Sequence, residues 1–113
     1  MSKVSIIYWS GTGNTEAMAF YIAEGAKEAG AEVNMVTADS ASAADVADVT
    51  AVALGCPSMG VEVLEETTME PLMCELDGVI SGKNVALFGS YGWGDGQWMR
   101  DWEGRATSDG ATL

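Results

Sequence analysis

The sequence has 113 residues, enough for one domain, and its 48% apolar content and 14 glycines exclude a disordered chain. Seventeen acidic against five basic residues give a formal net charge of −12, which disfavours nucleic-acid binding because such a surface repels phosphates. The chain has no histidine, which excludes imidazole-based catalysis, and its two cysteines, Cys56 and Cys74, have no metal-ligand spacing.

The first half of the chain alternates between strand and helix patterns. Residues 3–9 are β-branched and apolar at nearly every position, as in a buried parallel strand. Residues 14–29 have apolar side chains at helical spacing and are followed by Gly30 as a stop. The same patterns predict a second strand at 32–37, a weak alanine-rich helix at 41–48 and a third buried strand at 49–56.

The second half continues the alternation. We expect a helix at 66–77, in which Pro71 is tolerated only near the start, then a strand at 84–88, a helix at 97–109 and the beginning of a strand at 111–113. Strands and helices that alternate over short connections predict an α/β fold with a doubly wound parallel sheet. No apolar run is near the ~20 residues of a membrane span, and the N-terminus lacks a secretory signal, so a cytoplasmic protein without a membrane partner is expected.

Three unusual segments follow the first, third and fourth strands, at the end of the sheet where ligands of such folds bind. Residues 10–15 combine glycines and hydroxyls at a helix N-terminus, which indicates an anion site, although the Walker lysine and the third glycine of the dinucleotide fingerprint are missing. Residues 55–62 contain Met59 beside Gly60. Residues 89–96 place a tryptophan among glycines, which favours a stacking platform for a planar ring. The alternative for each segment is an ordinary turn that binds nothing.

Together these segments resemble short-chain bacterial flavodoxins of the type found in anaerobes. The resemblance rests on the motifs YWSGTGNTE (8–16), LGCP (54–57), MG (59–60) and ALFGSYGWGDG (86–96), which occur in the family's order along essentially the whole chain. It implies a flavodoxin-like sheet of strand order 2-1-3-4-5, non-covalently bound FMN and one-electron transfer at low potential. It implies an electron-transfer protein and not an enzyme.

The resemblance also implies which residues bind the cofactor. The FMN phosphate would be held by Ser10, Gly11, Thr12, Gly13, Asn14 and Thr15. The flavin ring would lie between Met59 and Trp93, with Gly60 as the peptide whose carbonyl turns toward flavin N5 and Glu62 near N3. The remaining residues of the site would be Ser58 and Val61 in the second segment and Ser90, Tyr91, Gly92 and Gly94 in the third.

Two features depart from the family. Val61 stands where relatives often have a small or polar residue, and its β-branched side chain restricts the turn that must change conformation at Gly60. The family continues beyond the position of Leu113 with a fifth strand and a last helix. We therefore expect residues 1–113 to be a single, C-terminally incomplete flavodoxin-like domain in which part of one apolar sheet face is uncovered.

The acidic stretch 28–82, which contains no basic residue, indicates redox partner proteins with basic docking faces. Glu62, Glu65 and Glu66 would lie nearest the flavin, and the full-length protein would be a monomer. The alternative is an acidic surface that serves solubility only.

Two other functions remain open: a flavodoxin-like NAD(P)H-dependent quinone reductase, which needs the space over the ring that Trp93 would fill, and a truncated non-redox interaction module. Trp98 and Trp102 lie in the last helix pattern, which predicts that they pack in the core.

Overall fold

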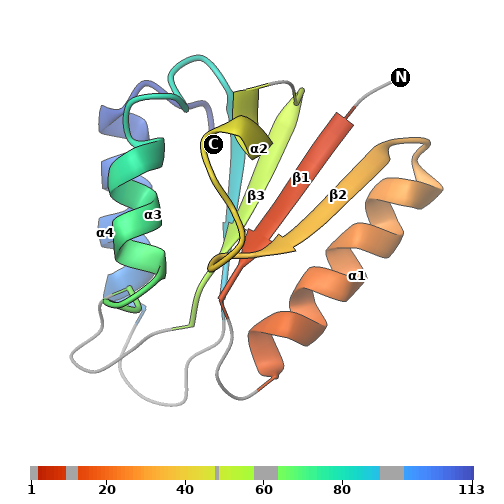
Figure 1. Ribbon diagram of the computed structural model, residues 1–113, viewed down its shortest axis with the longest axis horizontal. Coiled ribbons are helices and arrows are strands. Elements are labelled where there is room, and N and C mark those ends of the chain that lie inside the picture. The colour runs from red at the N-terminus through yellow and green to blue at the C-terminus, as the bar shows by residue number, and fades with distance from the viewer. Residues whose placement is uncertain (1–2, 10–12, 48, 58–63, 90–95) are drawn as a thin grey trace.

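The computed structural model describes residues 3–9, 13–47, 49–57, 64–89 and 96–113, and these form an α/β fold around one parallel sheet. The sheet has the order β2-β1-β3-β4, which agrees with the order that the resemblance implies for the first four strands, and Figure 1 shows it with its helices. The strands are β1 (Lys3–Tyr8), β2 (Glu32–Thr37), β3 (Ala51–Gly55) and β4 (Asn84–Phe88). The helices are α1 (Asn14–Glu28), α2 (Ala44–Ala47), α3 (Met69–Leu76) and α4 (Gln97–Ser108).

The strand register aligns the carboxyl ends of the strands. Tyr8, the last residue of β1, pairs with Thr37 of β2 on one side and with Gly55 of β3 on the other. Gly55 pairs in turn with Phe88, the last residue of β4. The segments that follow β1, β3 and β4 therefore all leave the sheet from the same edge.

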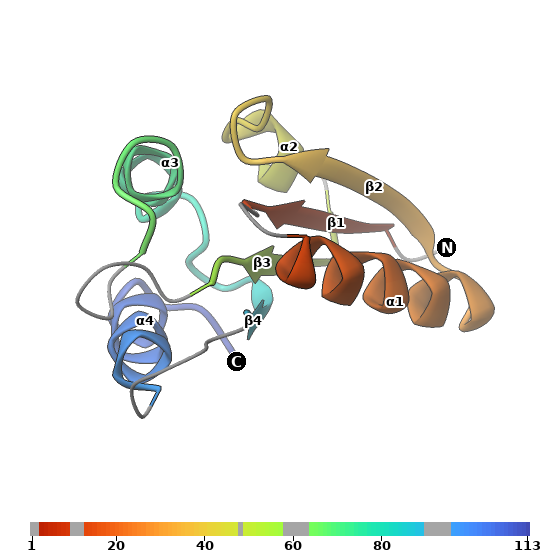
Figure 2. The same ribbon diagram turned by 90° about the horizontal axis from the view of Figure 1, so that it is seen from below.

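The helices form two layers on opposite faces of the sheet, as Figure 2 shows. Alternate residues of a strand point to opposite faces, so Ile6 packs toward α1 in one cluster while Ile7 belongs to the other. The α1 layer is small, with Ala19 and Ala23 buried against the sheet. The opposite layer is larger and buries Met73 of α3 and Trp102 of α4 among its members.

Two helices begin later than the sequence pattern predicts. The alanine-rich stretch forms only one helical turn, from Ala44, because its Asp45 carboxylate accepts the backbone N–H of Ser42 and holds the preceding residues as a cap. Helix α3 begins at Met69 and not at residue 66, because the carboxylate of Glu65 binds the backbone N–H groups that precede the helix. Pro71 lies in the first turn of α3, where the sequence analysis places it.

The last residues of the chain lie beside β4. Thr112 forms a parallel bridge with Asn84, and the N–H of Val85 donates to the carbonyl of Thr112 at 2.8 Å. This confirms the expectation that a strand begins near residue 111. None of the helices among the described residues is long and apolar enough to cross a membrane.

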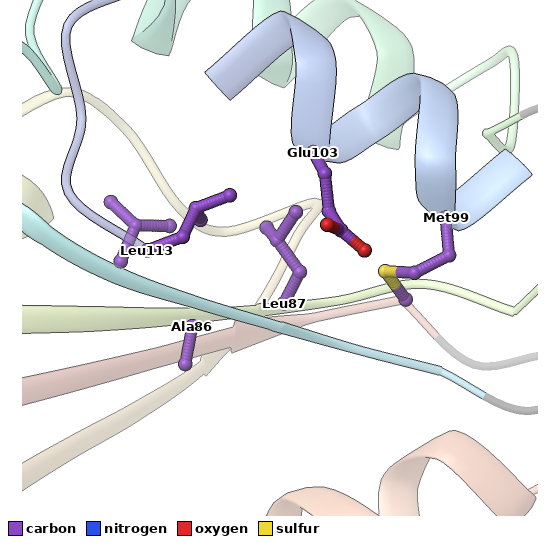
Figure 3. A pocket seen from close by; sticks show the side chains of 6 residues that line it. Ala86, Leu87, Met99, Glu103 and Leu113 are labelled. Atoms are coloured by element: carbon purple, nitrogen blue, oxygen red, sulfur yellow. The ribbon is translucent and has the colours of Figure 1, made fainter. Parts of the chain in front are cut away.

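Within the described part of the chain, two hollows border β4. One has a volume of about 320 Å³ and lies between the strand and α4, with Leu87, Met99 and Glu103 in its wall (Figure 3). The other, about 280 Å³, lies beside α1 and is lined by Ile22, Ala53 and other apolar residues of the sheet face.

Candidate functional site

The carboxyl ends of the strands are tied to one another by backbone hydrogen bonds that continue beyond the regular ladders. The N–H of Trp9 donates to the carbonyl of Gly55 at 3.0 Å, and the N–H of Cys56 donates to the carbonyl of Phe88 at 3.0 Å. Strand β1 lies between β2 and β3. The connection from β1 to β2 therefore runs to one side of β1, and the connection from β2 to β3 passes to its other side, so the strand order reverses at β1. Ligands of open α/β sheets bind at the carboxyl ends of the strands where such a reversal occurs, and we call this part of the molecule the crevice.

Of the predicted cofactor residues, the structure describes Gly13, Asn14 and Thr15, and all three lie at this edge. The other predicted residues lie outside the described part of the chain: Ser10, Gly11, Thr12, Ser58, Met59, Gly60, Val61, Glu62, Ser90, Tyr91, Gly92, Trp93 and Gly94. The described residues show instead where the three segments begin and end. The first joins β1 to α1, the second joins β3 to α3, and the third joins β4 to α4.

The N-terminus of α1 has the chemistry of an anion site. Gly13 is the N-cap residue of the helix, with φ of 95°, a left-handed conformation that favours glycine. The N–H groups of a helical first turn have no partner within the helix, and the helix dipole adds positive potential there. Thr15 is 1% exposed, so its side chain is held in place beside this turn. The arrangement fits a phosphate bound by hydrogen bonds.

Basic side chains contribute little at this edge. Lys3 begins β1, Lys27 ends α1, Lys83 precedes β4 and Arg105 lies in the second half of α4, so these four belong to the opposite end of the sheet. Arg100, in the first turns of α4, is the fifth base of the chain. Glu16 is exposed in the first turn of α1, and its charge together with burial raises the pKa of the neighbouring Tyr8 phenol, burial being the larger cause.

Two glycines allow the ends of β3 and β4 to approach closely. A Cβ on Gly55 would lie 2.2 Å from the ring of Phe88, and a Cβ on Gly89 would lie 2.1 Å from the carbonyl oxygen of Cys56. Real Cβ atoms do not come so near to other atoms, so a side chain at position 89 would push the Cys56 backbone away, and one at position 55 would displace the Phe88 ring. The sequence analysis gives these glycines no role, and only the close approach reveals it.

Cys56 is buried where the second segment begins. Its thiol accepts the backbone N–H of Glu65 at 3.4 Å and lies 3.4 Å from the carbonyl oxygen of Pro57. Burial raises the pKa of the thiol to about 11, and the charge of Glu65 acts in the same direction while the backbone hydrogen bond opposes it. The thiol is therefore protonated at neutral pH. In the part of the chain that the structure describes, no three or more His, Cys, Asp or Glu side chains lie close enough together to hold a metal ion.

Glu65 is buried and does not form part of an exposed docking surface, so the expectation that it lies beside Glu66 in a partner contact is wrong. The residue is 6% exposed, and its carboxylate accepts the backbone N–H groups of Thr67, Thr68 and Met69 at 2.7–2.9 Å, together with the Thr67 hydroxyl. Burial raises the pKa of this carboxyl, but these hydrogen bonds outweigh it and the net shift is downward. Glu65 therefore acts as an N-terminal cap of α3.

Trp98 and Trp102 are buried core residues, which confirms the prediction from their helical spacing. They are 3% and 1% exposed. Their indole N–H groups differ, however. The Nε1–H of Trp98 donates to the carbonyl oxygen of Cys56 at 3.1 Å, whereas that of Trp102 is buried without a hydrogen-bond partner among the described residues. Trp98 therefore has a polar contact with the site that its helical spacing does not reveal.

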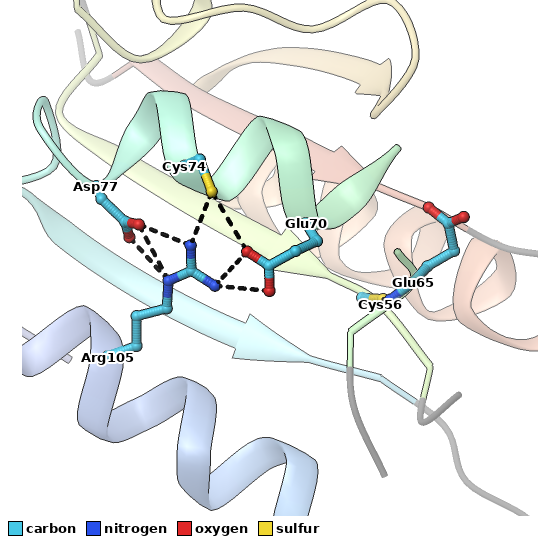
Figure 4. Close-up of polar contacts among 6 residues, drawn as sticks. All are labelled: Cys56, Glu65, Glu70, Cys74, Asp77 and Arg105. Atoms are coloured by element: carbon cyan, nitrogen blue, oxygen red, sulfur yellow. Dashed lines mark hydrogen bonds and ion pairs between the residues drawn. The ribbon is translucent and has the colours of Figure 1, made fainter. Parts of the chain in front are cut away.

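A second polar cluster joins α3 to α4 at a distance from this edge (Figure 4). The guanidinium of Arg105 forms ion pairs with Asp77 and with Glu70, both at 2.7 Å. Cys74 lies between them and accepts a longer contact from the same guanidinium. Figure 4 shows Cys56 and Glu65 separate from this cluster. The cluster links the two helices of one layer and takes no part in the crevice.

Comparison with known proteins agrees with the geometry. A family model described as flavodoxin matches residues 6–113. The flavodoxins of Megasphaera elsdenii and Clostridium beijerinckii are each 50% identical over 110 residues, which is 97% of this chain and 80% of theirs. The solution structure of two-electron reduced Megasphaera elsdenii flavodoxin superposes with a TM-score of 0.93 at 50% identity, covering 96% of this chain and 80% of that chain.

The flavodoxin matches extend over nearly the whole chain, whereas NAD(P)H dehydrogenases (quinone) of two Rhizobium species match only 35 residues, 31% of it. This difference favours a carrier over the quinone reductase and over the non-redox module. The strand order and the three connections that leave the same edge of the sheet are the framework that such a carrier needs. The chain belongs to the flavodoxin family and is an FMN-binding electron carrier, not an enzyme.

Proposed function

We propose that this chain carries single electrons at low potential with FMN held, without a covalent bond, at the carboxyl ends of β1, β3 and β4. The observation that supports this most is the convergence of the three segment ends at the crevice beside β1. FMN supplies the chemistry, because its ring accepts and releases one electron at a time. The protein binds the group, orients it and limits the access of water.

The phosphate belongs at the N-terminus of α1 in this proposal, held by residues 10–15. The left-handed cap at Gly13 and the buried Thr15 support that placement. Because the nearby chain offers hydroxyl and N–H donors and few bases, hydrogen bonds to a charged acceptor would supply most of the affinity.

The phosphate site is tested by removing a hydroxyl. Thr12→Val and Thr15→Val should each raise the Kd for FMN about ten- to thirtyfold, the effect of one lost hydrogen bond to a charged group. Riboflavin, which lacks the phosphate, should bind far more weakly than FMN to the unaltered protein. Thr107→Val, at an exposed position near the end of α4, is the matched control and should bind FMN normally. Equal affinity for riboflavin and FMN would contradict the placement.

The flavin ring belongs between the second and third segments. In this proposal Met59 and Trp93 lie against its two faces, Gly60 presents its carbonyl to flavin N5 and Glu62 lies near N3. Ser58 and Val61 complete the second segment, and the remaining contacts come from the third: Ser90, Tyr91, Gly92 and Gly94. Support comes from the described ends of these segments, Cys56 and Gly89, which lie in direct contact.

Replacing Trp93 tests the ring position. Trp93→Ala should weaken FMN binding and restore part of the flavin fluorescence that a stacked indole quenches. It should also admit water, which solvates the added negative charge, so the potential of the second reduction step should become less negative. Unchanged affinity, emission and potentials would show that the ring lies elsewhere.

Redox partners with basic docking faces are the finer part of the proposal. Glu16 in the first turn of α1 and Glu66 just before α3 are exposed and lie at the crevice end of the sheet. They replace the buried Glu65 as the described acids that a partner would meet. Opposite charges on two proteins accelerate their encounter, and salt screens that attraction.

The docking surface is tested by charge and by salt. The double variant Glu16→Gln, Glu66→Gln should slow electron transfer to a basic partner at low ionic strength, and the difference should shrink as salt is added. Glu28→Gln removes an exposed acid at the far end of α1 and should have little effect. A rate that does not change between low and physiological ionic strength would mean that the acidity serves solubility only.

A further inference from the structure

Described residues on both sides of the two segments assigned to the flavin ring contact one residue, Cys56. The second segment starts at Cys56 itself, and its far end returns there through the backbone N–H of Glu65, which donates to the Cys56 thiol at 3.4 Å. The third segment starts at Gly89, directly after Phe88, whose carbonyl accepts the N–H of Cys56. Its far end leads into α4, where the Trp98 indole donates to the Cys56 carbonyl at 3.1 Å.

We infer that Cys56 is the positioning residue that fixes the two ring-binding segments relative to each other, and that the Trp98 indole N–H is the side-chain donor, among the described residues, that holds its carbonyl. This inference rests on the proposed position of the flavin ring. Cys56 itself is 0% exposed and stays within the core. It acts only through the chain ends that it joins.

The contact geometry leaves little freedom at this point. A hydrogen at Gly89 is all that fits against the Cys56 carbonyl, since a Cβ would lie 2.1 Å from that oxygen. A carbonyl group in such surroundings must keep a donor, because an unsatisfied buried acceptor is costly. If the Trp98 donor is removed, the carbonyl loses this contact, and the described segment ends at Cys56 and Gly89 are less firmly held against α4.

The test replaces only the donor. Trp98→Phe keeps an aromatic ring in the core and removes the N–H, and Trp102→Phe is the matched control because its indole N–H has no partner among the described residues. We expect Trp98→Phe to raise the Kd for FMN about tenfold, the effect of one hydrogen bond, and Trp102→Phe to leave it within about twofold. Both variants are compared at denaturant-free conditions in which the protein without FMN is shown to be folded.

A second measurement does not depend on FMN. In a Cys74→Ser background Cys56 is the single thiol, and its reaction with a disulfide reagent such as DTNB reports how often this residue becomes exposed. A buried, protonated thiol reacts slowly. Trp98→Phe should accelerate the reaction about tenfold or more, beyond the increase that its change in unfolding free energy predicts, while Trp102→Phe should not.

The outcomes separate this inference from the proposed function. If Trp93→Ala weakens FMN binding but Trp98→Phe changes neither affinity nor thiol reactivity, the ring position stands and the role of Cys56 is refuted. If Trp98→Phe accelerates the thiol reaction and leaves FMN affinity unchanged, Cys56 holds the segments together but does not position the ring, and the inference fails in that form. Should Trp98→Phe not fold, Cys56→Ala against Cys74→Ala compares loss of the buried thiol contact with loss of an exposed thiol. In that pair only Cys56→Ala should weaken FMN binding.

Discussion

Replacing Glu65 by glutamine should destabilise the protein by an amount that depends on pH. In the structure one carboxylate oxygen accepts the N–H groups of Thr68 and Met69, and the other accepts the N–H and the hydroxyl of Thr67. Glutamine can keep the first oxygen but puts an NH₂ group in place of the second. The N–H of Thr67 would then face another donor, and the negative charge at the N-terminus of α3 would be lost.

The magnitude follows from these contacts. Losing a hydrogen bond to a charged group costs about 1.5–3 kcal/mol, and the helix-terminal charge adds about 0.3–1 kcal/mol, so Glu65→Gln should lower the free energy of unfolding by about 2–4 kcal/mol at pH 7. That is a large fraction of the ~5–15 kcal/mol that stabilises a typical domain. Urea unfolding followed by tryptophan fluorescence, at one fixed concentration of free FMN, measures it.

The pH dependence provides the sharper check. The hydrogen bonds lower the pKa of Glu65 in the folded protein below its unfolded value of about 4.3, so its contribution is complete above that value and is lost as pH falls through the folded pKa. Unaltered protein and variant should therefore converge in stability at strongly acid pH. Glu66→Gln, an exposed neighbour, should stay within about 0.5 kcal/mol throughout. A Glu65→Gln cost that is the same at pH 7 and at pH 3, or that matches the Glu66 control, would refute the capping role.

Three further perturbations test other parts of the fold. Arg105→Met removes two partly exposed ion pairs between α3 and α4. It should lower the free energy of unfolding by about 1–2 kcal/mol at low salt and by less at high salt, which chemical denaturation at the two salt concentrations measures. Asp109→Asn should stabilise the protein by about 1–2 kcal/mol at pH 7.5 and should not stabilise it at pH 4. The neighbouring Asp77 raises the pKa of Asp109 to about 6, so the favourable protonated form is lost as pH rises through that value. Thermal melts of both proteins at the two pH values test this prediction. Gly55→Ala should cost about 1–3 kcal/mol, because its Cβ meets the buried ring of Phe88, and an unchanged Tm would disprove the close approach.

The fold was predictable from the sequence because its signals are local. The apolar run at residues 3–9 and the helical spacing after residue 14 depend on neighbours within a few positions, and the strands and helices occur where these patterns place them. The boundaries were less accurate, at the start of α3 above all. There the deciding group is the buried carboxylate of Glu65, and the backbone N–H of the same residue donates to the thiol of Cys56 just after β3.

The sequence by itself determined the family, the parallel sheet and the three segments at the crevice. Each of these depends on patterns of neighbouring residues, such as the motif at residues 10–15. Only the tertiary structure decided that Glu65 is a buried cap and not a docking acid, and that Trp98 differs from Trp102 in binding the carbonyl of Cys56. The physical reason is that burial and hydrogen bonding depend on what the folded chain places beside a group. For Trp98 and Cys56 that partner lies 42 positions away in the sequence.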